Sequence, residues 1–438
     1  MQPSKESARK SPRAKSLAAL WARVKAHPLA RLGPGLITGA ADDDPSGIAT
    51  YSQAGAQFGL DMLWTMPLAY PLMSAIQSMC AQIGRVTGEG LAANIKTAFP
   101  PIVLKGVVLL LLIANTLNIA ADVAAMGEVA ELVSGVDRHL MTVFFVLVTL
   151  LLQIFVPYHR YVFFLKWLTL SLLAYAAVLF TVHVPWGEVA LRTVWPKLTL
   201  NFNTAAVIVG IFGTTISPYL FFWQASQEVE DMRAKRSAAP LLEDPKAART
   251  ELRRIRWDTW SGMFVSDLAA YFIILATAVT LHVSGTTDIQ TAAQAASALR
   301  PLAGEFAFLL FAIGILGVGL IGVPVLAGSA AYALAEAMGW KSGLERSPKN
   351  ARGFYAVIAI SVLAGLVIQY SPISPMKALF WSAVINGVVA VPLMVVIILI
   401  ASSKSVMGAF TSSRAIVALG WIGAAVMGLA AVLMLVPG

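Results

Sequence analysis

Long apolar runs alternate with short charged segments along most of the sequence. An apolar run of about 20 residues is long enough to cross a bilayer as an α-helix. These runs end at charged residues, prolines and glycines. They predict eleven spanning helices, at 33–58, 63–84, 102–134, 140–157, 161–183, 204–229, 258–283, 304–338, 353–370, 376–401 and 415–436. We therefore expect an all-α integral membrane protein.

The basic residues predict the orientation of these helices. With the amino terminus in the cytosol, 27 of the 32 Lys and Arg residues fall on the cytosolic side, all except Arg138, Arg192, Lys197, Arg300 and Lys377. Positive charge collects on the cytosolic side of membrane proteins. We expect a bacterial inner-membrane protein with a basic cytosolic tail at 1–30, a cytosolic loop at 231–256 and an external carboxyl terminus.

The composition narrows the class of function. Of the 438 residues, 58% are apolar and 13% are charged, which is about half the charged share of a typical soluble domain. The net charge of +9 arises in the segments between apolar runs and therefore does not predict nucleic-acid binding. Cys80 is the only cysteine, and the sequence has no Cys and His cluster for zinc. We expect membrane lipid around the chain, no nucleic-acid partner and no cofactor.

Three consecutive carboxylates lie in the middle of the first predicted span. Asp42, Asp43 and Asp44 precede Pro45, and each Asp facing lipid would cost about 2.5 to 3.5 kcal/mol. The proline removes a backbone donor and disfavours helical geometry at the residue before it. The carbonyls around Ala41 then lack helical partners. A carboxylate beside unpaired carbonyls can form an oxygen site for a cation in a broken helix.

The sixth predicted span has a similar interruption. Thr214, Ser217, Pro218 and Tyr219 lie in the middle of an otherwise apolar run. Two interrupted spans five positions apart indicate two five-helix repeats of inverted topology, whose broken helices meet at the membrane midplane and form a transport site. We expect the repeats at 31–200 and 201–405, followed by an eleventh helix within 406–438.

Other polar residues inside the spans have two interpretations. Asn115, Asn118 and Asp122 follow one another at steps of three and four, so they share one face of the third helix. This stripe, and the isolated Asn386 in the tenth span, could either line the transport pathway or form hydrogen bonds that hold helices together.

Several short motifs resemble the Nramp divalent-metal transporters. They are Gly-Pro-Gly at 33–35, Asp-Pro-Ser-Gly at 44–47, Gln-Ala-Gly-Ala at 53–56 and Arg-Val-Thr-Gly at 85–88. The resemblance implies a LeuT-like fold with two inverted five-helix repeats plus one extra helix, and transport of divalent metal ions. It also implies that Asp44 matches the metal-binding Asp of the family, while Ala41 and Thr214 match the residues that lend carbonyl oxygens.

The departures from the family pattern concern the metal and the coupling ion. Gly47 stands where the family has a ligand Asn, and Ser217 and Tyr219 stand where it has Met and His. Losing the soft thioether removes the preference for transition metals over Mg2+. Asp122 matches the first acid of the family's proton route, but the second position is Ala125. The sequence thus resembles the Nramp-related magnesium transporter branch, in which the ion stays partly hydrated and proton coupling is absent.

These features predict a transporter rather than an enzyme, moving Mg2+ and/or Mn2+ by alternating access without proton coupling. The expected metal-site residues are Asp44, Ala41, Thr214, Ser217 and Gly47. The expected pathway residues are Asp42, Asp43, Asn115, Asn118, Asp122, Tyr219 and Asn386, and the helix breakers are Pro45 and Pro218.

Besides a non-transporting sensor or receptor with a degenerate site, three alternatives stay open at this point. One is a proton-coupled Mn2+ and Fe2+ transporter of the same family. A second is an amino-acid carrier of the LeuT-like fold, although three carboxylates would repel its substrate. The third is a Mg2+-dependent membrane enzyme acting on a diphosphate. That chemistry usually needs a nearby Lys or Arg, and no basic residue lies between Arg31 and Arg85.

Overall fold

Helices make up every regular element of the residues that the structure describes, which are 34–156, 168–197, 201–234, 238–344, 346–368 and 373–434 of a computed structural model. The longer helices are α4 (Thr65–Thr87), α6 (Pro101–Ser134), α7 (Arg138–Phe155), α11 (Phe202–Thr215), α12 (Pro218–Ala234), α13 (Ala248–Thr277), α16 (Ala307–Met338), α17 (Arg352–Ile368), α18 (Pro375–Ser402) and α20 (Arg414–Leu433). The shorter ones are α2 (Pro34–Asp42), α3 (Pro45–Phe58), α5 (Leu91–Ala98), α9 (Leu173–Val178), α10 (Trp186–Val194), α14 (Ala292–Ala296), α15 (Arg300–Ala303) and α19 (Lys404–Met407). The all-α prediction is confirmed.

Seven helical stretches within the described residues are long and apolar enough to cross a membrane. They are Pro101–Ser134, Arg138–Phe155, Phe202–Ala234, Pro245–His282, Ala292–Met338, Pro375–Ser402 and Arg414–Leu433. The first predicted span is absent from this set and is divided into two short helices of 9 and 14 residues. The fifth predicted span lies partly outside the described residues, and the predicted tail at 1–30 lies wholly outside them.

Both predicted interruptions are present. Helix α2 ends at Asp42 and α3 begins at Pro45, with Asp44 in an extended conformation between them (φ −69°, ψ 173°). The second pair, α11 and α12, is divided between Thr215 and Pro218. In each pair the proline starts the second helix, a position where its missing N–H costs nothing.

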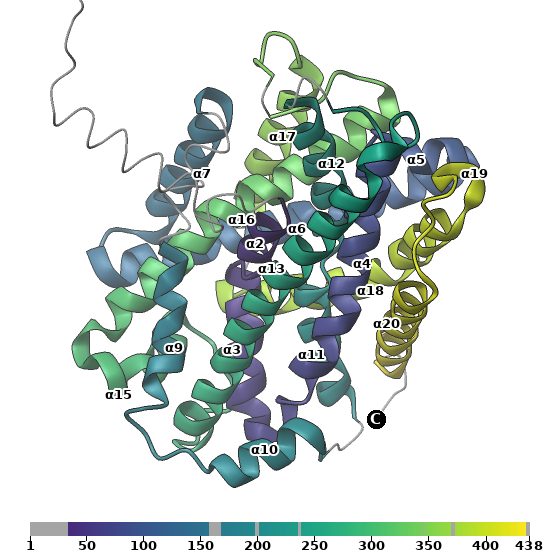
Figure 1. The fold of residues 1–438 in the computed structure, drawn as a ribbon. Helices are drawn as coiled ribbons and strands as arrows, with labels where there is room; N and C mark the ends of the chain where they lie inside the picture. Colours follow the sequence, from purple (N-terminus) through teal and green to yellow (C-terminus); the bar gives the residue numbers. More distant parts are fainter. Residues whose placement is uncertain are drawn as a thin grey trace, which may run out of the picture.

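The two broken pairs form the interior of the bundle. Figure 1 shows α2, α3, α11 and α12 in the middle of the molecule, with α7 and α20 toward opposite sides. All the apolar part of α11 and α12 is buried inside the protein, whereas most of α7 and α20 faces outward. The position of α20 fits an additional helix outside two repeats, while the repeat boundaries at 31–200 and 201–405 stay a prediction.

Close helix crossings at glycines hold the broken helices in place. A methyl group at Gly35 would lie 2.7 Å from the backbone nitrogen of Thr259, and one at Gly39 would overlap the Gly262 carbonyl, so α2 packs directly on α13. Gly213 of α11 faces the backbone of α18 in the same way. Small residues permit such backbone contact between membrane helices.

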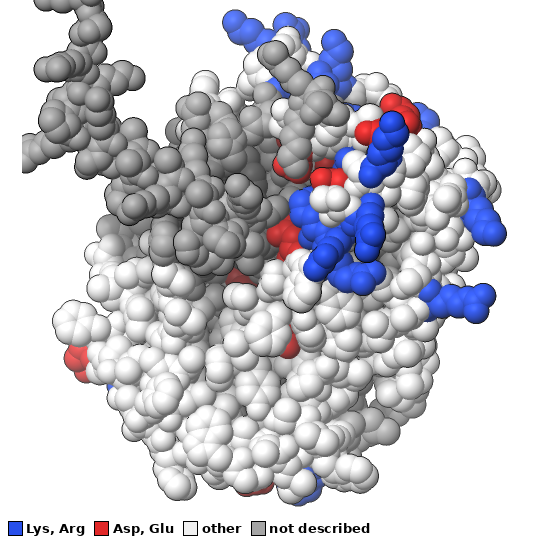
Figure 2. All heavy atoms as spheres, viewed as in Figure 1, with Lys and Arg blue, Asp and Glu red and all other residues white. Residues whose placement is uncertain are grey.

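The charged segment at 231–256 is more helical than a loop. Helix α12 continues to Ala234, and α13 starts at Ala248, so residues up to Arg256 form the first turns of a helix that continues into the apolar interior. Ion pairs connect this region to its neighbours, with Arg254 contacting Glu228 at 2.5 Å and Arg85 contacting Glu251 at 3.3 Å. Figure 2 shows Lys and Arg gathered on the upper part of this face and a largely uncharged lower part.

Candidate cation-binding site

Asp44 lies at the break between α2 and α3, and its side chain is 1% exposed. Its Oδ1 accepts hydrogen bonds from the Ser46 hydroxyl (2.6 Å) and the Gly47 backbone N–H (2.9 Å). These two donors belong to the first turn of α3, where Asp44 is the N-cap residue. Its Oδ2 accepts from Asn118 Nδ2 (3.0 Å) and from the Tyr219 hydroxyl (3.1 Å). The carboxylate therefore joins α3, α6 and α12.

Asn118 is the centre of the polar contacts on α6. Its Nδ2 donates to Asp44 and also to Asp122 Oδ2 at 3.1 Å. Its Oδ1 accepts from Asn386 Nδ2 of α18 at 3.0 Å. Because both ends of the amide are engaged, its orientation is fixed, and Asn386 reaches Asp44 only through Asn118.

Tyr219, the second residue of α12, connects the two broken helix pairs. Its hydroxyl lies 3.0 Å from the Ala41 carbonyl oxygen and 3.1 Å from Asp44 Oδ2. The Ala41 carbonyl has no helical partner at the usual position, because residue 45 is a proline. The ring of Tyr219 is fully buried.

The hydroxyl of Ser217, which lies between α11 and α12, bonds to the end of α11. It donates to the carbonyl oxygens of Thr214 (2.6 Å) and Gly213 (2.9 Å). The Thr214 carbonyl thus lies at the break between α11 and α12 as predicted, but it already has a donor. The side chain of Thr214 lies closer to the first break, since a methyl group at Gly47 would be 3.2 Å from Thr214 Oγ1.

Asp42 and Asp43 point to α13 rather than to Asp44. The Ser266 hydroxyl lies 2.7 Å from Asp42 Oδ2 and 3.1 Å from Asp43 Oδ1. Asp267 is the next residue of α13 and is 8% exposed. The consecutive aspartates are therefore divided between two environments, as expected where a helix is interrupted.

The polar stripe on α6 also divides into two parts. Asn115 donates to the Leu326 carbonyl (2.9 Å) and the Ser329 hydroxyl (2.8 Å) of α16. Asn115 therefore joins α6 to α16, whereas Asn118 and Asp122 belong to the cluster around Asp44.

The described residues contain no ion pair to Asp42, Asp43, Asp44, Asp122 or Asp267. They also contain no group of three His, Cys, Asp or Glu side chains arranged to hold a metal ion. A cation at Asp44 would therefore be held by one carboxylate together with carbonyl and hydroxyl oxygens. Such a donor set suits a hard cation that keeps some of its water.

Sequence reasoning missed two contributors to the site. Ser46 was a recognisable one, because an Asp followed by Pro and small residues at a helix start is an N-cap pattern. Ser266 gave no signal of its own, since a lone serine in an apolar helix usually bonds to the backbone of its own helix.

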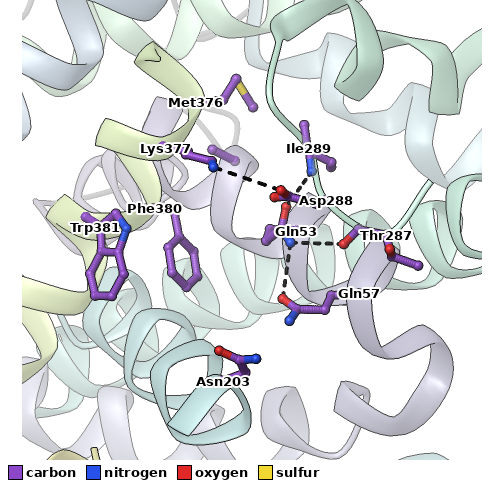
Figure 3. A pocket seen from close by; sticks show the side chains of 11 residues that line it. Gln53, Gln57, Asn203, Thr287, Asp288, Ile289, Met376, Lys377, Phe380 and Trp381 are labelled. Atoms are coloured by element: carbon purple, nitrogen blue, oxygen red, sulfur yellow. Dashed lines mark hydrogen bonds and ion pairs between the residues drawn. The ribbon is translucent and has the colours of Figure 1, made fainter. Parts of the chain in front are cut away.

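A pocket of about 420 Å³ lies at the far end of α3 from Asp44. Figure 3 shows Gln53 at its centre, bonded to Gln57, to the Thr287 carbonyl (3.2 Å) and to the Ile289 N–H (2.9 Å). Lys377 and Asp288 form an ion pair of 3.9 Å at its edge. The pocket is lined by Ala49, Gln53, Gln57, Asn203, Thr287, Asp288, Ile289, Met376, Lys377, Phe380 and Trp381.

The helices beside this pocket are closely packed. A methyl group at Gly210 of α11 would lie 3.2 Å from Thr50 Cγ2 of α3 and 3.4 Å from Phe380 of α18. Asp44 does not line the pocket and is 1% exposed.

A helical bundle whose two broken helices meet at a buried carboxylate defines a membrane transporter of the LeuT-like fold. Two solved structures share this fold. One is the crystal structure of the Eremococcus coleocola manganese transporter in complex with an aromatic bis-isothiourea substituted compound, with a TM-score of 0.72 and 16% identity, covering 94% of this chain and 86% of that one. The other is Mhp1, a nucleobase-cation-symport-1 family transporter, with a TM-score of 0.57 and 14% identity over 92% of each chain.

The chain belongs to the Nramp family, described as natural resistance-associated macrophage protein-like, which it matches over residues 35–437. It is 26% identical over 428 residues to the divalent metal cation transporter MntH of Acidiphilium cryptum, covering 93% of this chain and 91% of the relative. It is 25% identical over 406 residues to MntH of Klebsiella pneumoniae, covering 90% of each. These relatives are transporters, and the chain is an integral membrane transporter rather than an enzyme.

Proposed function

We propose that this transporter carries divalent metal cations across the membrane by alternating access around Asp44. The cations are Mg2+ and/or Mn2+, and their movement is not coupled to protons. The single observation that carries the proposal is the position of Asp44, buried at the meeting point of α2, α3, α6 and α12. The names of the related MntH divalent metal cation transporters support the class of substrate.

The oxygen atoms around Asp44 support a hard cation. They are the carboxylate itself, the hydroxyls of Ser46 and Tyr219 and the Ala41 carbonyl, while the Gly47 N–H and the Asn118 amide nitrogen donate hydrogen bonds to the carboxylate. Ser217 takes the position of a thioether, and its hydroxyl is bonded to carbonyl oxygens of α11. Without a soft sulfur ligand, the site has no chemical reason to prefer a late transition metal over Mg2+.

The ligand chemistry of the site favours an ion that keeps water. Mg2+ loses its water reluctantly and is usually held by one or two carboxylates with waters retained. One carboxylate with neutral oxygens matches that requirement. Gly47 adds no ligand at the first turn of α3, where a methyl group would already lie 3.2 Å from Thr214 Oγ1 and 3.3 Å from the Tyr51 ring.

Two substitutions support transport without proton coupling. Asp122 lies beside Asn118 in the cluster, but Ala125 follows where the family pattern has a second acid, and Tyr219 replaces an imidazole. A phenol does not exchange its proton near neutral pH as an imidazole does. The chain therefore lacks two of the groups that would move a proton along the family's route.

One observation favours the proton-coupled alternative. Asp122 is fully buried, and its Oδ1 has no hydrogen-bond partner among the described residues. A buried carboxyl beside the substrate-binding Asp could carry a proton by itself. Recording internal pH during metal uptake distinguishes this alternative from the proposed uncoupled transport.

The proposal is tested by uptake of Mg2+ and of Mn2+ into proteoliposomes that contain the full-length protein. Asp44→Asn keeps the shape of the side chain and removes its charge, so uptake of both ions should fall to the level of protein-free vesicles. The matched control is Asp61→Asn, because Asp61 is a partly exposed carboxylate paired with Arg192 at 3.3 Å, three residues beyond the end of α3 that is opposite to Asp44. Equal uptake by the Asp44→Asn variant and the wild type would refute the proposed site.

A further inference from the structure

The Tyr219 hydroxyl has two acceptors and only one proton. It lies 3.0 Å from the Ala41 carbonyl oxygen and 3.1 Å from Asp44 Oδ2. If the proton points to one of these oxygens, the other faces the phenolic oxygen without a proton between them. Two unprotonated oxygens at this separation repel each other, most strongly inside a protein.

Neither oxygen can be relieved by its own backbone. The Ala41 carbonyl lacks the N–H that would follow four residues later, because that residue is Pro45. Asp44 Oδ2 accepts one further hydrogen bond, from Asn118. Tyr219 itself is fully buried, so bulk water does not reach its hydroxyl. A cation that contacts all three oxygens would remove this repulsion.

The spacing of these oxygens suits a small divalent cation. An octahedral ion with oxygen ligands at about 2.1 Å, the value for Mg2+, places neighbouring ligands about 3.0 Å apart. Ca2+, with ligands at about 2.3 to 2.6 Å, needs roughly 3.3 to 3.7 Å. The two separations from the phenolic oxygen, 3.0 and 3.1 Å, are hydrogen-bond lengths that also fit the smaller ion without movement of the oxygens.

We propose that Tyr219 is a ligand of the transported cation, its phenolic oxygen forming with the Ala41 carbonyl and Asp44 Oδ2 one face of the coordination sphere. Water fills the remaining positions. The Tyr219 proton then turns away from the ion, and α12 joins α2 and α3 through the metal. This inference rests on the proposed function and adds a neutral ligand that favours Mg2+ and Mn2+ over Ca2+.

The assignment changes the roles expected for two residues of α11 and α12. Ser217 was expected at the metal, but its hydroxyl donates to Thr214 and Gly213. Tyr219 was expected to line the pathway, yet its hydroxyl contacts the Ala41 carbonyl oxygen and Asp44 Oδ2 at the break between α2 and α3.

Calorimetric titration of the purified full-length protein with MgCl2, MnCl2 and CaCl2 tests the assignment. Tyr219→Phe removes one oxygen and keeps the ring, so binding of Mg2+ and Mn2+ should weaken about tenfold and that of Ca2+ less. Tyr70→Phe is the matched control, because its hydroxyl also bonds to a carbonyl oxygen, that of Trp260 at 3.3 Å, outside the site. This control should bind all three ions like the wild type.

The outcomes separate this inference from the proposed function. If Asp44→Asn loses binding while Tyr219→Phe binds as tightly as the wild type or more tightly, Tyr219 is not a ligand and the cation site stands without it. If the wild type binds no divalent cation, both proposals fail. An anomalous difference map of crystals grown with Mn2+ shows directly where the ion binds. The expected result is a Mn2+ peak bonded to the Tyr219 phenolic oxygen. A Mn2+ peak separated from that oxygen by a water molecule would overturn the assignment.

Discussion

At the scale of single residues, the hydrogen bonds to Asp44 and Asp122 depend on the orientation of the Asn118 amide. Asn118 donates to Asp44 and Asp122, and it can do so only while its oxygen faces the Nδ2 of Asn386. Asn386 touches neither carboxylate, so it acts on the proposed metal site by positioning Asn118. Groups that orient ligands in this way often matter for metal affinity nearly as much as the ligands themselves.

Asn386→Ala should therefore raise the KM for Mg2+ and Mn2+ uptake about tenfold with a smaller effect on maximal rate. Concentration-dependent uptake into proteoliposomes measures both quantities. Asn115→Ala is the matched control on the same stripe, because Asn115 bonds only to α16. It should leave KM unchanged and lower the stability by about 1 kcal/mol. Equal KM changes in the two variants would contradict the positioning role.

The sequence was more informative about chain breaks than about side-chain partners. Pro45 and Pro218 fix the breaks because a proline cannot continue the preceding helix. The partner of Ser217 could not be foreseen, since a serine hydroxyl near a helix end can bond to its own backbone or to a ligand equally well. Likewise, only three-dimensional packing brings Ser266 of α13 to Asp42 and Asp43.

At the scale of helices, glycines allow the broken helices to approach their supports. Gly213 of α11 faces the Ala383 carbonyl and the Gly387 N–H of α18, and an added methyl group would overlap both. The apolar pattern predicted the helices themselves. It did not predict the short helices α5 and α10 between spans, because their 8 and 9 residues are too few for a clear periodic signal.

Gly213→Ala should lower the thermal stability of the detergent-solubilised protein, because forcing a methyl group against backbone typically costs about 1 to 3 kcal/mol. Gly106→Ala provides the comparison on α6, where the added methyl group would meet no atom within 4 Å. Its melting temperature should equal or exceed that of the wild type, because Ala is a better helix former than Gly. A Gly213→Ala variant as stable as the Gly106→Ala variant would mean that α11 and α18 do not cross this closely.

At the scale of the whole molecule, charge is concentrated toward one end of the bundle (Figure 2). The arginines at the start of α13 belong to this region, and we infer from the distribution of Lys and Arg that it faces the cytosol. Glu305, just before α16, lies at the end of the predicted span 304–338 that is expected to face the external side. The fold alone is compatible with either orientation, so the orientation depends on the charge pattern.

Thiol labelling with a membrane-impermeant reagent tests this orientation. Cys80 is fully buried, so the wild type should give little background. In intact cells the Glu305→Cys variant should be labelled, and the Arg249→Cys variant only after the membrane is permeabilised. The reverse pattern would show that the chain is inserted the other way.

The central claim is transport of a divalent cation, centred on Asp44, without accompanying protons. The most direct test records internal Mg2+ and internal pH together in the same proteoliposomes, with Asp44→Asn vesicles alongside. The account predicts Mg2+ entry that leaves internal pH unchanged, is not accelerated by an inward proton gradient and is lost in the variant. Acidification in proportion to metal entry, or the absence of Mg2+ entry while Mn2+ is taken up, would contradict it.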